Sequence, residues 1–519
     1  MKKRVMGLIL VPFLLFSAWF VPFVQPVQAE KEEHAWQDEI MYFIMIDRFN
    51  NGDTSNDFDV NRDDPKAYHG GDFRGITEKL DYLKDMGFTA LWLTPIVQNE
   101  EKGYHGYWTE DFYNVEEHFG TLEDFKELVA EAHKRDMKII VDLVVNHTGY
   151  QHAWLKEEDK KDWFNPNESI RDWNDQEQVE NGWIYGLPDI NQNNPETRKY
   201  LLDMAKWWIE ETDIDGYRLD TVKHVPKDFW EDFSKEMKSV KEDFFLIGEV
   251  WHDNPEYVAG YQETGIDSLV DYPTYNELTR IFTTPNQPLT RLSSIHYHNQ
   301  NSYENPNILG TFLDNHDVER FTRAAVKKNH HPPTRLKLAL TYMYGAPGIP
   351  IIYYGTEIAL DGGEDPDNRR DMNFRADKEL MNYITKLAEL RKTLPSLTHG
   401  TYDMVYDNGG MAVIKREYEG EITFVAINNT TETKVAQIDA ELVGENMELR
   451  GTLGDELVRN SDGKYSIGLD RETAEIYTVS EDSGVNIAFV GAMALIYGGF
   501  VAFIAAAIIR RKKMKNNKD

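Results

Sequence analysis

Three carboxylate residues in this sequence each follow an apolar run that is typical of a buried strand. Asp220 ends the run "IDGYRLD", Glu249 ends "FFLIGE", and Asp317 follows "ILGTFL". Arg218 lies two residues before Asp220, so on a strand both side chains would point to the same face. An unpaired charge is costly to bury, so this pair is either a structural ion pair or one edge of an active site. Carboxylates that converge could transfer protons or attack a substrate.

Strand-like and helix-like segments alternate along most of the chain, and they must position these residues. Eight apolar runs are separated by amphipathic stretches such as "LEDFKELVAEAHKRD". This alternation predicts an α/β fold with a parallel sheet covered by helices, most simply a closed (β/α)8 TIM barrel. An open doubly wound sheet is the alternative, weakened because no glycine-rich phosphate loop follows the first strand. The predicted strands are 41–46, 88–93, 138–143, 214–219, 244–249, 266–271, 308–313 and 350–355.

In a parallel barrel, functional residues gather at the carboxyl ends of the strands. Any one polar residue there could be a loop cap or a salt-bridge partner. Three carboxylates together with two histidines instead predict an active site. The polar residues at the predicted strand ends are Asp142, Asn146, His147, Arg218, Asp220, Glu249, Asn315, His316 and Asp317.

The spacing of the repeats changes at two places, and these changes define the predicted domains. About 50 extra residues separate Leu143 from Asp213, far more than a usual strand-to-helix loop contains. The sequence there is polar, aromatic and turn-rich, which favours a small inserted domain over 148–188 within a barrel domain of 30–395. Short alternating strands then predict a C-terminal all-β sandwich over 396–482.

Six short stretches resemble the sequence signatures of the α-amylase family of glycoside hydrolases. They occur in the family's order within residues 38 to about 480, and the family's layout is also a barrel, an insertion after strand three and a β-sandwich. "LPDIN" and the Trp207–Trp208 pair further resemble a bacterial α-amylase subgroup close to the neopullulanases. The chain lacks the N-terminal β-domain through which typical neopullulanases dimerise, so we expect a monomer. The stretches are "GYHGYWTEDFY" (103–113), "DLVVNH" (142–147), "LPDIN" (187–191), "GYRLDTVKH" (216–224), "GEVW" (248–251) and "FLDNHD" (312–317).

The resemblance implies a catalytic role for each of the three carboxylates. Asp220 would be the nucleophile, Glu249 the general acid/base and Asp317 the transition-state stabiliser. A retaining hydrolase needs two carboxyl groups about 5–5.5 Å apart, one to attack the anomeric carbon and one to protonate the leaving oxygen. We expect Arg218 to keep Asp220 ionised, and apolar neighbours such as Trp251 to favour protonated Glu249 by desolvation.

The resemblance also implies substrate contacts around the cleaved bond. His147 and His316 would bind hydroxyls of the sugar beside that bond. Tyr107 would stack on the same sugar, with His105 near it. Arg218 is counted with these substrate-binding residues.

Further substrate contacts are implied on either side of this centre. Lys223 and His224 would face the leaving side. Asp365 and Arg369, in "EDPDNRR", resemble the family's contacts to more distant non-reducing sugars. The alternative for Asp365 and Arg369 is that they are exposed loop charges.

A loop rich in Asn, Asp and Gly predicts a calcium (Ca2+) site. Hard oxygen ligands in this number suit calcium, and the loop resembles that of cyclodextrin glucanotransferases and neopullulanases. The alternative is a cluster of turns that needs no ion. The predicted ligands are Asn51, Asp53, Asn56, Asp57, the Gly70 carbonyl and Asp72.

A second calcium site would join the insertion to the barrel. Its predicted ligands are Asn146, Asp189 and the carbonyl of His224. No further ligand is identifiable from the sequence.

The two ends of the chain differ from its middle. Residues 1–29 have a basic start, an apolar run and a small residue before the predicted cut, as in a secretory signal peptide; an uncleaved anchor is the alternative. Residues 485–509 contain no formal charge and are long enough to span a bilayer, and the basic tail 510–519 would stay in the cytoplasm. The alternatives for 485–509 are a buried core helix and an apolar, adhesive tail.

The composition limits the partners and the location. The formal net charge is −33 although both ends are basic, so the body of the protein would repel nucleic acid. There is no Cys, which excludes disulfides and thiol catalysis. These features fit a bacterial protein, most simply Gram-positive, that is either secreted or held on the extracellular face of the membrane.

Together these observations predict a retaining endo-hydrolase of internal α-1,4-glucosidic bonds in starch and maltooligosaccharides. One alternative is a relative that cleaves pullulan or cyclodextrins, or that transfers glycosyl groups with the same residues. Another is a non-catalytic, amylase-like ectodomain, although such proteins lack the catalytic carboxylates that this chain has.

Overall fold

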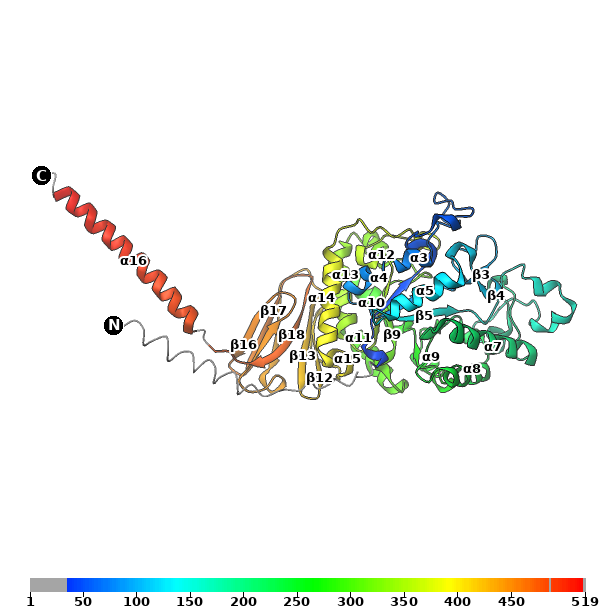
Figure 1. The fold of residues 1–519 in the computed structure, drawn as a ribbon. Coiled ribbons are helices and arrows are strands. Elements are labelled where there is room, and N and C mark those ends of the chain that lie inside the picture. The colour runs from blue at the N-terminus through cyan, green and yellow to red at the C-terminus, as the bar shows by residue number, and fades with distance from the viewer. Residues whose placement is uncertain (1–34, 485–486, 517–519) are drawn as a thin grey trace, which may run out of the picture. The chain divides into compact units, whose positions relative to one another are not determined.

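The computed structural model describes residues 35–484 and 487–516. The predicted signal peptide, residues 1–29, lies outside the described residues. Within residues 35–484, a parallel barrel is followed by an antiparallel β-domain (Figure 1).

Eight parallel strands form the barrel, and each overlaps one of the predicted strands. Their order is β8-β7-β6-β5-β2-β1-β10-β9, and a parallel bridge between Val270 and Gly310 joins the two end strands. The backbone N–H of Asp271 also donates to the Gly310 carbonyl at 2.9 Å, which supports this closure. The strands are β1 (Met41–Ile44), β2 (Ala90–Leu93), β5 (Lys138–Leu143), β6 (Gly216–Leu219), β7 (Phe245–Gly248), β8 (Ser268–Leu269), β9 (Gly310–Phe312) and β10 (Ile349–Tyr353).

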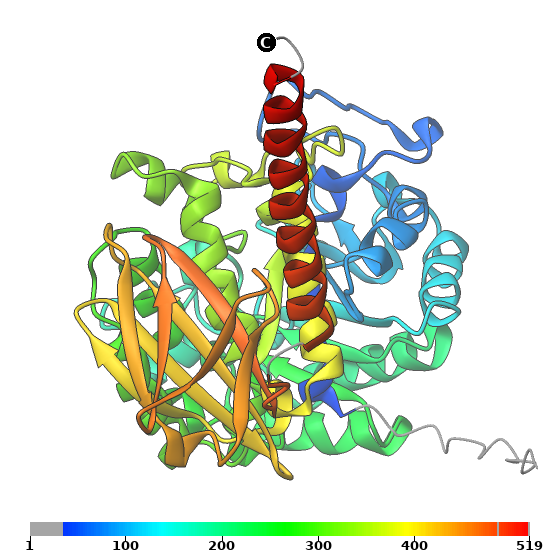
Figure 2. The same ribbon diagram turned by 90° about the vertical axis from the view of Figure 1, so that its left-hand side faces the viewer.

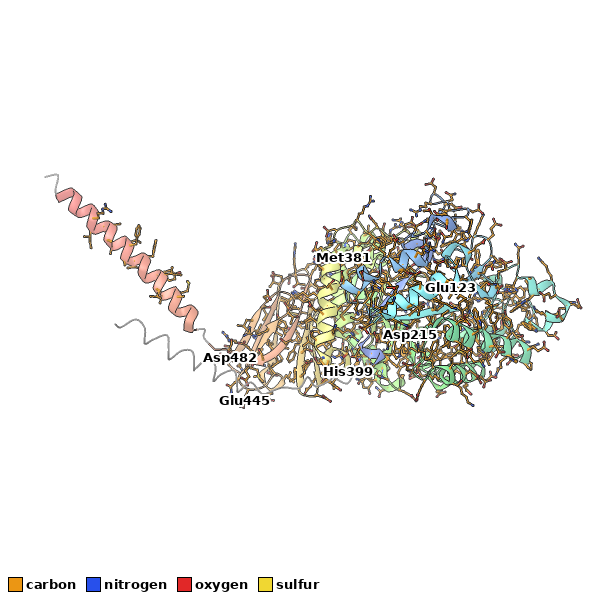
Figure 3. All side chains as sticks on the ribbon, viewed as in Figure 1. Glu123, Asp215, Met381, His399, Glu445 and Asp482 are labelled. Atoms are coloured by element: carbon orange, nitrogen blue, oxygen red, sulfur yellow. The ribbon has the colours of Figure 1, made fainter. Side chains whose placement is uncertain are left out.

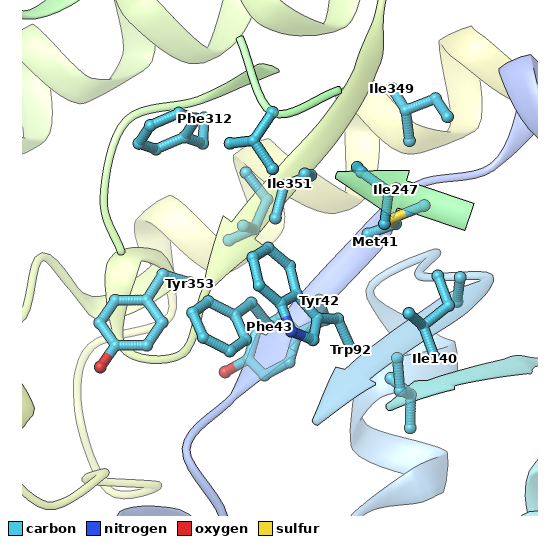
Figure 4. Close-up of a cluster of buried hydrophobic side chains, with 14 of the residues drawn as sticks. Met41, Tyr42, Phe43, Trp92, Ile140, Ile247, Phe312, Ile349, Ile351 and Tyr353 are labelled. Atoms are coloured by element: carbon cyan, nitrogen blue, oxygen red, sulfur yellow. The ribbon is translucent and has the colours of Figure 1, made fainter. Parts of the chain in front are cut away.

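The barrel strands read as continuous apolar runs because both of their faces are buried. Helices cover one face, and the strands' own side chains fill the interior (Figure 4). Phe43 stacks on Trp92 with ring centroids 3.9 Å apart, and Tyr353 lies 5.0 Å from Phe43. The guanidinium of Arg218 lies 5.2 Å above the Trp92 ring. The apolar interior therefore ends directly beneath the polar strand ends.

The covering helices begin at residues suited to helix starts. Thr121 and Asp124 form a reciprocal capping box at the start of α5, and Asn194 caps α7 ahead of Pro195. The α-helices of the barrel region are α2 (Ile46–Phe49), α3 (Phe73–Thr77), α4 (Leu80–Asp85), α5 (Leu122–His133), α6 (Gln176–Asn181), α7 (Pro195–Thr212), α8 (Lys227–Val240), α9 (Pro255–Ala259), α10 (Tyr272–Phe282), α11 (Thr290–Ser302), α12 (Phe321–Lys327), α13 (Pro332–Gly345), α14 (Glu379–Thr393) and α15 (Pro395–His399).

The long segment between β5 and α7 contains α6 and short 3-10 helices. Its aromatic residues Trp154 and Trp163 are buried in the same apolar cluster as the barrel core. Trp154 packs on Phe112, which belongs to the small hairpin of β3 (Val97–Asn99) and β4 (Thr109–Val115). The separate inserted domain predicted for 148–188 is not confirmed, because this segment shares its buried core with the barrel.

The C-terminal domain is an antiparallel β-structure with strand order β11-β12-β13-β18-β15-β16-β17-β14 (Figure 2, yellow to orange). Alternate residues of β12 and β13 face different cores. Met411 and Val413 pack inside the domain, whereas Ala412 and Ile414 join the barrel core. The strands are β11 (Asp403–Asn408), β12 (Met411–Tyr418), β13 (Glu421–Asn428), β14 (Lys434–Asp439), β15 (Met447–Gly451), β16 (Leu457–Ser461), β17 (Lys464–Leu469) and β18 (Thr473–Glu481).

A buried arginine also joins the two domains. Arg416 on β12 donates from Nη1 to the carbonyl of Gly345, the last residue of α13, at 2.5 Å. It donates from Nε to Thr401 at 2.6 Å and from Nη2 to Gly400 at 3.0 Å, both through carbonyl oxygens. Burial lowers the pKa of Arg416 to about 9. Three carbonyl groups therefore accept hydrogen bonds from this buried charge.

Among the residues that the structure describes, one helix is long and apolar enough to cross a membrane. It is α16 (Ile487–Asn516), and the stretch concerned is Gly491–Arg510, identified by length and composition only. The membrane span predicted for 485–509 stays a prediction. The acidic residues Glu123, Glu445 and Asp482 are exposed (Figure 3), and the repulsion of nucleic acid stays a prediction.

Candidate active site

The carboxyl ends of the barrel strands bring the predicted catalytic residues together. Asp220 follows β6, Glu249 follows β7, and Asp317 lies in the loop after β9. Asp220 and Glu249 are buried, at 5% exposure each, whereas Asp317 is open to solvent. One carboxylate of the three therefore lies at the mouth of the site.

Arg218 is the centre of this arrangement. Its Nη1 lies 2.7 Å from Asp220 Oδ1, and its Nη2 lies 2.6 Å from Glu249 Oε1. Two nitrogens of one planar guanidinium thus hold an oxygen of each carboxylate, so the two carboxyl groups are adjacent. Arg218 is 1% exposed, and the cost of burying its charge is offset by carboxylates at Nη1 and Nη2, while Nε has no hydrogen-bond partner among the described residues.

Asp142 completes the partners of Arg218. It lies opposite Arg218 in the β5–β6 register, and its two oxygens are 2.8 and 3.0 Å from Nη1. Tyr107 and Trp92 donate to Asp142 Oδ2 at 2.7 and 3.2 Å. Burial raises the pKa of Asp142 to about 7, against the opposing effect of Arg218. From the sequence, Asp142 was placed at a strand end but given no role. Its place at the end of the strand before the one that carries Arg218 is the signal that could have suggested a contact with Arg218.

The surroundings of Asp220 and Glu249 both resist ionisation. Burial raises the pKa of each carboxyl, and Arg218 opposes the rise in both cases. Thr221 connects them, because its N–H donates to Glu249 Oε2 at 3.1 Å and its hydroxyl donates to Asp220 Oδ2 at 3.0 Å. Arg218 therefore favours the charged form of both carboxyl groups but does not outweigh the effect of their burial.

An aromatic pair lies beside Glu249, and it differs from what the sequence suggested. Trp251 is 46% exposed, and its ring stacks on Tyr272 at 5.0 Å. Tyr272 is buried, and its hydroxyl donates to Glu249 Oε1 at 2.9 Å. Sequence reasoning named Trp251 and missed Tyr272, which follows the sixth predicted strand directly.

The residues predicted to bind the central sugar form one wall. The Tyr107 and His316 rings are parallel with centroids 4.9 Å apart, and His147 Nε2 lies 3.2 Å from the Tyr107 carbonyl. The N–H of Tyr107 donates to His105 Nδ1 at 3.1 Å. Burial lowers the pKa of His147 to about 4 and lowers the pKa of His105 and His316 well below the usual value. These imidazoles are therefore neutral hydrogen-bonding groups.

Arg369 and Asp365 join the Asp317 side of the site. Arg369 is 8% exposed, so it is not an exposed loop charge. It donates from Nε to the His316 carbonyl at 2.9 Å, and its Nη1 and Nη2 lie 2.9 Å from Asp365 and 3.5 Å from Asp317. His316 Nε2 lies 3.2 Å from Asp317.

Lys223 and His224 lie on the opposite side. Lys223 Nζ donates to the Trp251 carbonyl at 2.8 Å and lies 5.7 Å from the centre of the half-exposed Trp173 ring. His224 is buried, and its Nδ1 lies 2.8 Å from the Val179 carbonyl. Burial lowers the pKa of His224 to about 3. Its neutral ring therefore holds the inserted segment, while Lys223 lies nearer the solvent.

The first predicted calcium loop offers some of its expected ligands. Gly70 adopts φ +87°, and a Cβ there would meet Asp57 Oδ1 at 2.5 Å and Asn51 Nδ2 at 2.6 Å, so these groups converge on the glycine backbone. The buried Asn56 Oδ1 has no hydrogen-bond partner among the described residues. These oxygen donors fit a hard cation.

Two acidic residues of the same loop are engaged elsewhere. Asp72 caps α3 through Gly75 N–H at 2.6 Å and accepts from the N–H groups of Gly52 and Asp53. Asp53 pairs with Arg74 at 2.6 Å. In the described part of the chain, no group of three His, Cys, Asp or Glu side chains is placed to hold a metal, so a site here would combine the Asp57 carboxylate with amide and carbonyl oxygens.

The second predicted calcium site is a convergence of polar groups around Asn146. Its amide lies 3.2 Å from Asp189 Oδ1 and 2.8 Å from the His224 carbonyl. With the nitrogen turned toward them, Asn146 donates to both; with the oxygen turned toward them, three oxygens meet and suit a cation. Burial raises the pKa of Asp189 well above its usual value. The donor set fits a bound cation, which would favour the charged form of Asp189.

The fold and the site define the class of protein. A (β/α)8 barrel with adjacent buried carboxylates at the ends of successive strands, and a third carboxylate opposite, has the arrangement of a glycoside hydrolase. The family model described as "Alpha amylase, catalytic domain" matches residues 43–383, and the α-amylase C-terminal domain model matches residues 400–477. The chain belongs to the α-amylase family.

Two solved structures agree with this assignment. The chain is 63% identical to an Anoxybacillus α-amylase, with a TM-score of 0.86, over 87% of this chain and 100% of that one. It is 57% identical to an α-amylase from Geobacillus thermoleovorans solved with acarbose, with a TM-score of 0.84 and the same coverage.

Curated relatives show a wider range of names. A β/α-amylase of Paenibacillus polymyxa is 39% identical over 85% of this chain, which spans only 38% of that relative's length. A cyclomaltodextrinase of Thermoanaerobacter pseudethanolicus is 34% identical over 77% of this chain and 72% of that protein. These names extend beyond α-amylase alone, in keeping with the predicted position near the neopullulanases.

Proposed function

We propose that this protein is a retaining endo-hydrolase of internal α-1,4-glucosidic bonds in starch and maltooligosaccharides. The observation that carries the proposal is the contact of one guanidinium with both Asp220 and Glu249, at 2.7 and 2.6 Å. Adjacent carboxyl groups suit a double-displacement mechanism, since an inverting enzyme needs a gap for water between them.

In the proposed mechanism, each group acts in two steps. Asp220 attacks the anomeric carbon while Glu249 gives its proton to the departing glycosidic oxygen. Glu249 then takes a proton from water, and the water oxygen displaces Asp220. Asp142 and Arg218 hold both carboxyl groups in place through the contacts described above.

A second candidate function uses the same residues on other α-glucans. It is favoured by the names of relatives, which include a cyclomaltodextrinase at 34% identity and a cyclomaltodextrin glucanotransferase of Klebsiella oxytoca at 31%. In that case the acceptor would be another sugar, or the substrate would be a cyclodextrin or pullulan. The residues at the bond would act in the same way, and the products would differ.

We further propose that calcium binds this protein at two places. Asn51, Asn56, Asp57 and the Gly70 carbonyl would supply one site, with Asp53 and Asp72 close by in the same loop. Asn146, Asp189 and the His224 carbonyl would supply the other. At the second place a cation would fix the inserted segment against the strand ends that carry His147 and Lys223.

The proposal for location rests on the two ends of the sequence. A signal segment at 1–29 and an apolar helix over 485–509 would hold the enzyme on the outer face of a bacterial membrane, with the basic tail inside. We also propose that the enzyme is a monomer, the state expected from its sequence.

Product analysis of the full-length chain in mild detergent tests the proposal. We expect α-anomeric maltooligosaccharides from soluble starch, with the anomer identified by proton NMR, and no activity for Asp220→Asn. Cyclodextrins cleaved in preference to starch would favour the second candidate. Inactivity on starch, pullulan and cyclodextrins would reject both candidates and favour a non-catalytic binding protein.

A further inference from the structure

Glu249 accepts hydrogen bonds unequally on its two oxygens. Oε1 lies 2.6 Å from Arg218 Nη2 and accepts from the Tyr272 hydroxyl at 2.9 Å. Oε2 accepts from the backbone N–H of Thr221 at 3.1 Å. An oxygen already bonded to a permanent cation and a phenol is a poor place for a proton. The carboxyl is therefore arranged to carry its proton on Oε2.

We propose that Tyr272 is a positioning residue for Glu249, holding Oε1 so that the proton-carrying Oε2 faces the leaving group. The inference rests on the proposed function, in which Glu249 is the general acid/base. Tyr272 does not touch the reacting atoms in this scheme; it acts through Glu249.

The direction of the Tyr272 hydroxyl is fixed by its other neighbour. Asn315 Nδ2 donates to the Tyr272 oxygen at 3.3 Å. Asn315 Oδ1 accepts from the N–H groups of Asp317 and Val318 at 2.8 and 3.1 Å, which sets the orientation of the amide. Since the phenol oxygen already accepts from Asn315, its own hydrogen is free for Glu249. The loop that carries Asp317 is thereby linked to Glu249 through two side chains.

The Tyr272 ring has little freedom to move. It is 1% exposed, with Trp251 stacked on it at 5.0 Å and the edge of Phe312 at 5.2 Å. Tyr272 is also the first residue of α10, whose N-cap Asp271 accepts from Thr274 N–H at 2.9 Å. Burial and the nearby Glu249 charge raise the pKa of Tyr272 well above its usual value, so it remains a donor throughout the reaction.

The position of this donor matters most after the first chemical step. When the Oε2 proton has moved to the glycosidic oxygen and the bond has broken, Glu249 is a carboxylate. Tyr272, Arg218 and Thr221 then stabilise that charge until Glu249 takes a proton from water. Tyr272 keeps its own proton in both steps.

The test compares Tyr272→Phe with Tyr275→Phe on two substrates. Tyr275 lies on the same helix and stacks on Phe312, but it belongs to no part of the site described above. Maltoheptaose requires protonation of its leaving group, whereas the fluoride of α-maltosyl fluoride departs with little protonic assistance. We expect Tyr272→Phe to lower kcat/KM on maltoheptaose about 10- to 100-fold, as for loss of a hydrogen bond to a charged group. On the fluoride we expect a change of no more than about twofold, and Tyr275→Phe should resemble wild type on both substrates.

The pH profile supplies a second readout. Tyr272→Phe removes a donor that favours the charged form of Glu249, so the alkaline limb of kcat/KM should move to higher pH. Asn315→Ala keeps the Tyr272 hydroxyl but removes the donor that fixes its direction. We therefore expect a fall in kcat/KM on maltoheptaose that is smaller than for Tyr272→Phe. This variant tests the link if Tyr272→Phe does not fold.

The outcomes separate this inference from the proposed function. If wild type hydrolyses both substrates and Tyr272→Phe loses equal activity on both, or none on either, the positioning role is wrong and the hydrolase proposal stands. If wild type hydrolyses neither substrate, the proposed function fails first.

Discussion

Asp142 and Arg218 occupy paired positions on neighbouring strands, and both carboxylate oxygens of Asp142 lie within 3.0 Å of one guanidinium nitrogen. Asp142 is in turn held by Tyr107 and Trp92. Arg218 is thus oriented from below by a buried carboxylate, so that its two nitrogens meet Asp220 and Glu249. The spacing of the two proposed catalytic groups depends on this one cation.

Replacing Arg218 by Lys should therefore reduce activity strongly. A single ammonium keeps the charge but cannot hold two carboxylates at once in the geometry of a planar fork. We expect kcat/KM on maltoheptaose to fall by at least about 100-fold, the size seen when one preorganised electrostatic group is lost. Arg198→Lys is the matched control, because Arg198 pairs with Asp228 and Asp232, which are largely exposed. Equal activity of the two variants would contradict a central role for Arg218.

His296 should make stability depend on pH at the acid side. Burial lowers its pKa to about 4 from an ordinary value of 6.5, so the unfolded chain binds its proton first as the pH falls. The stabilisation is therefore complete above pH 6.5 and is lost as the pH falls toward 4. The Tm of wild type minus the Tm of His296→Phe should therefore decrease as the pH falls from 6.5 toward 4. A constant gap would show that His296 does not titrate in this way.

Arg416→Met should destabilise the protein without changing the site. The substitution removes the Arg416 donor from the buried carbonyl groups of Gly345 and Gly400 and from the partly buried carbonyl of Thr401. We expect a loss of about 3 kcal/mol in the free energy of unfolding, as each unsatisfied group costs about 1–3 kcal/mol. Denaturant titration measures the loss, and activity at 25 °C should be retained. Arg375→Met, at an exposed position, serves as the control.

Calcium removal should lower Tm if the two proposed sites bind the ion. An ion present at 100 times its Kd adds about 2.7 kcal/mol of stability. We expect a chelator to lower Tm in wild type and added calcium to restore it. Asp57→Asn should weaken the response, whereas Asp63→Asn, at a nearby exposed position, should leave it unchanged. A chelator without effect on wild type would contradict both proposed sites.

The eight barrel strands were predictable because each is an apolar run buried on both faces, and these runs stand out against polar loops. The gathering of Arg218, Asp220 and Glu249 followed from the same reasoning, since parallel strands end on one side. Strand lengths were less predictable: the run 266–271 forms only the two-residue strand β8.

Contacts between side chains on different strands could not be read from the sequence. Tyr272 follows a predicted strand, but nothing in its neighbours shows that its hydroxyl reaches Glu249. Trp251 was expected to shield Glu249, yet it lies half exposed with its ring stacked on Tyr272. The packing of the insertion could not be read either, because nothing in the sequence shows that Trp154 and Trp163 join the apolar cluster of the barrel.

The pairing of β1 with β10 has a consequence for how this chain folds. Met41 near the start of the barrel lies beside Ile351 near its end, so the ring closes only when almost the whole barrel sequence is present. Contacts so distant in sequence form slowly, and incomplete chains expose strand edges meanwhile. If the chain is exported as proposed and crosses the membrane unfolded, its catalytic ring can close only after β10 has emerged.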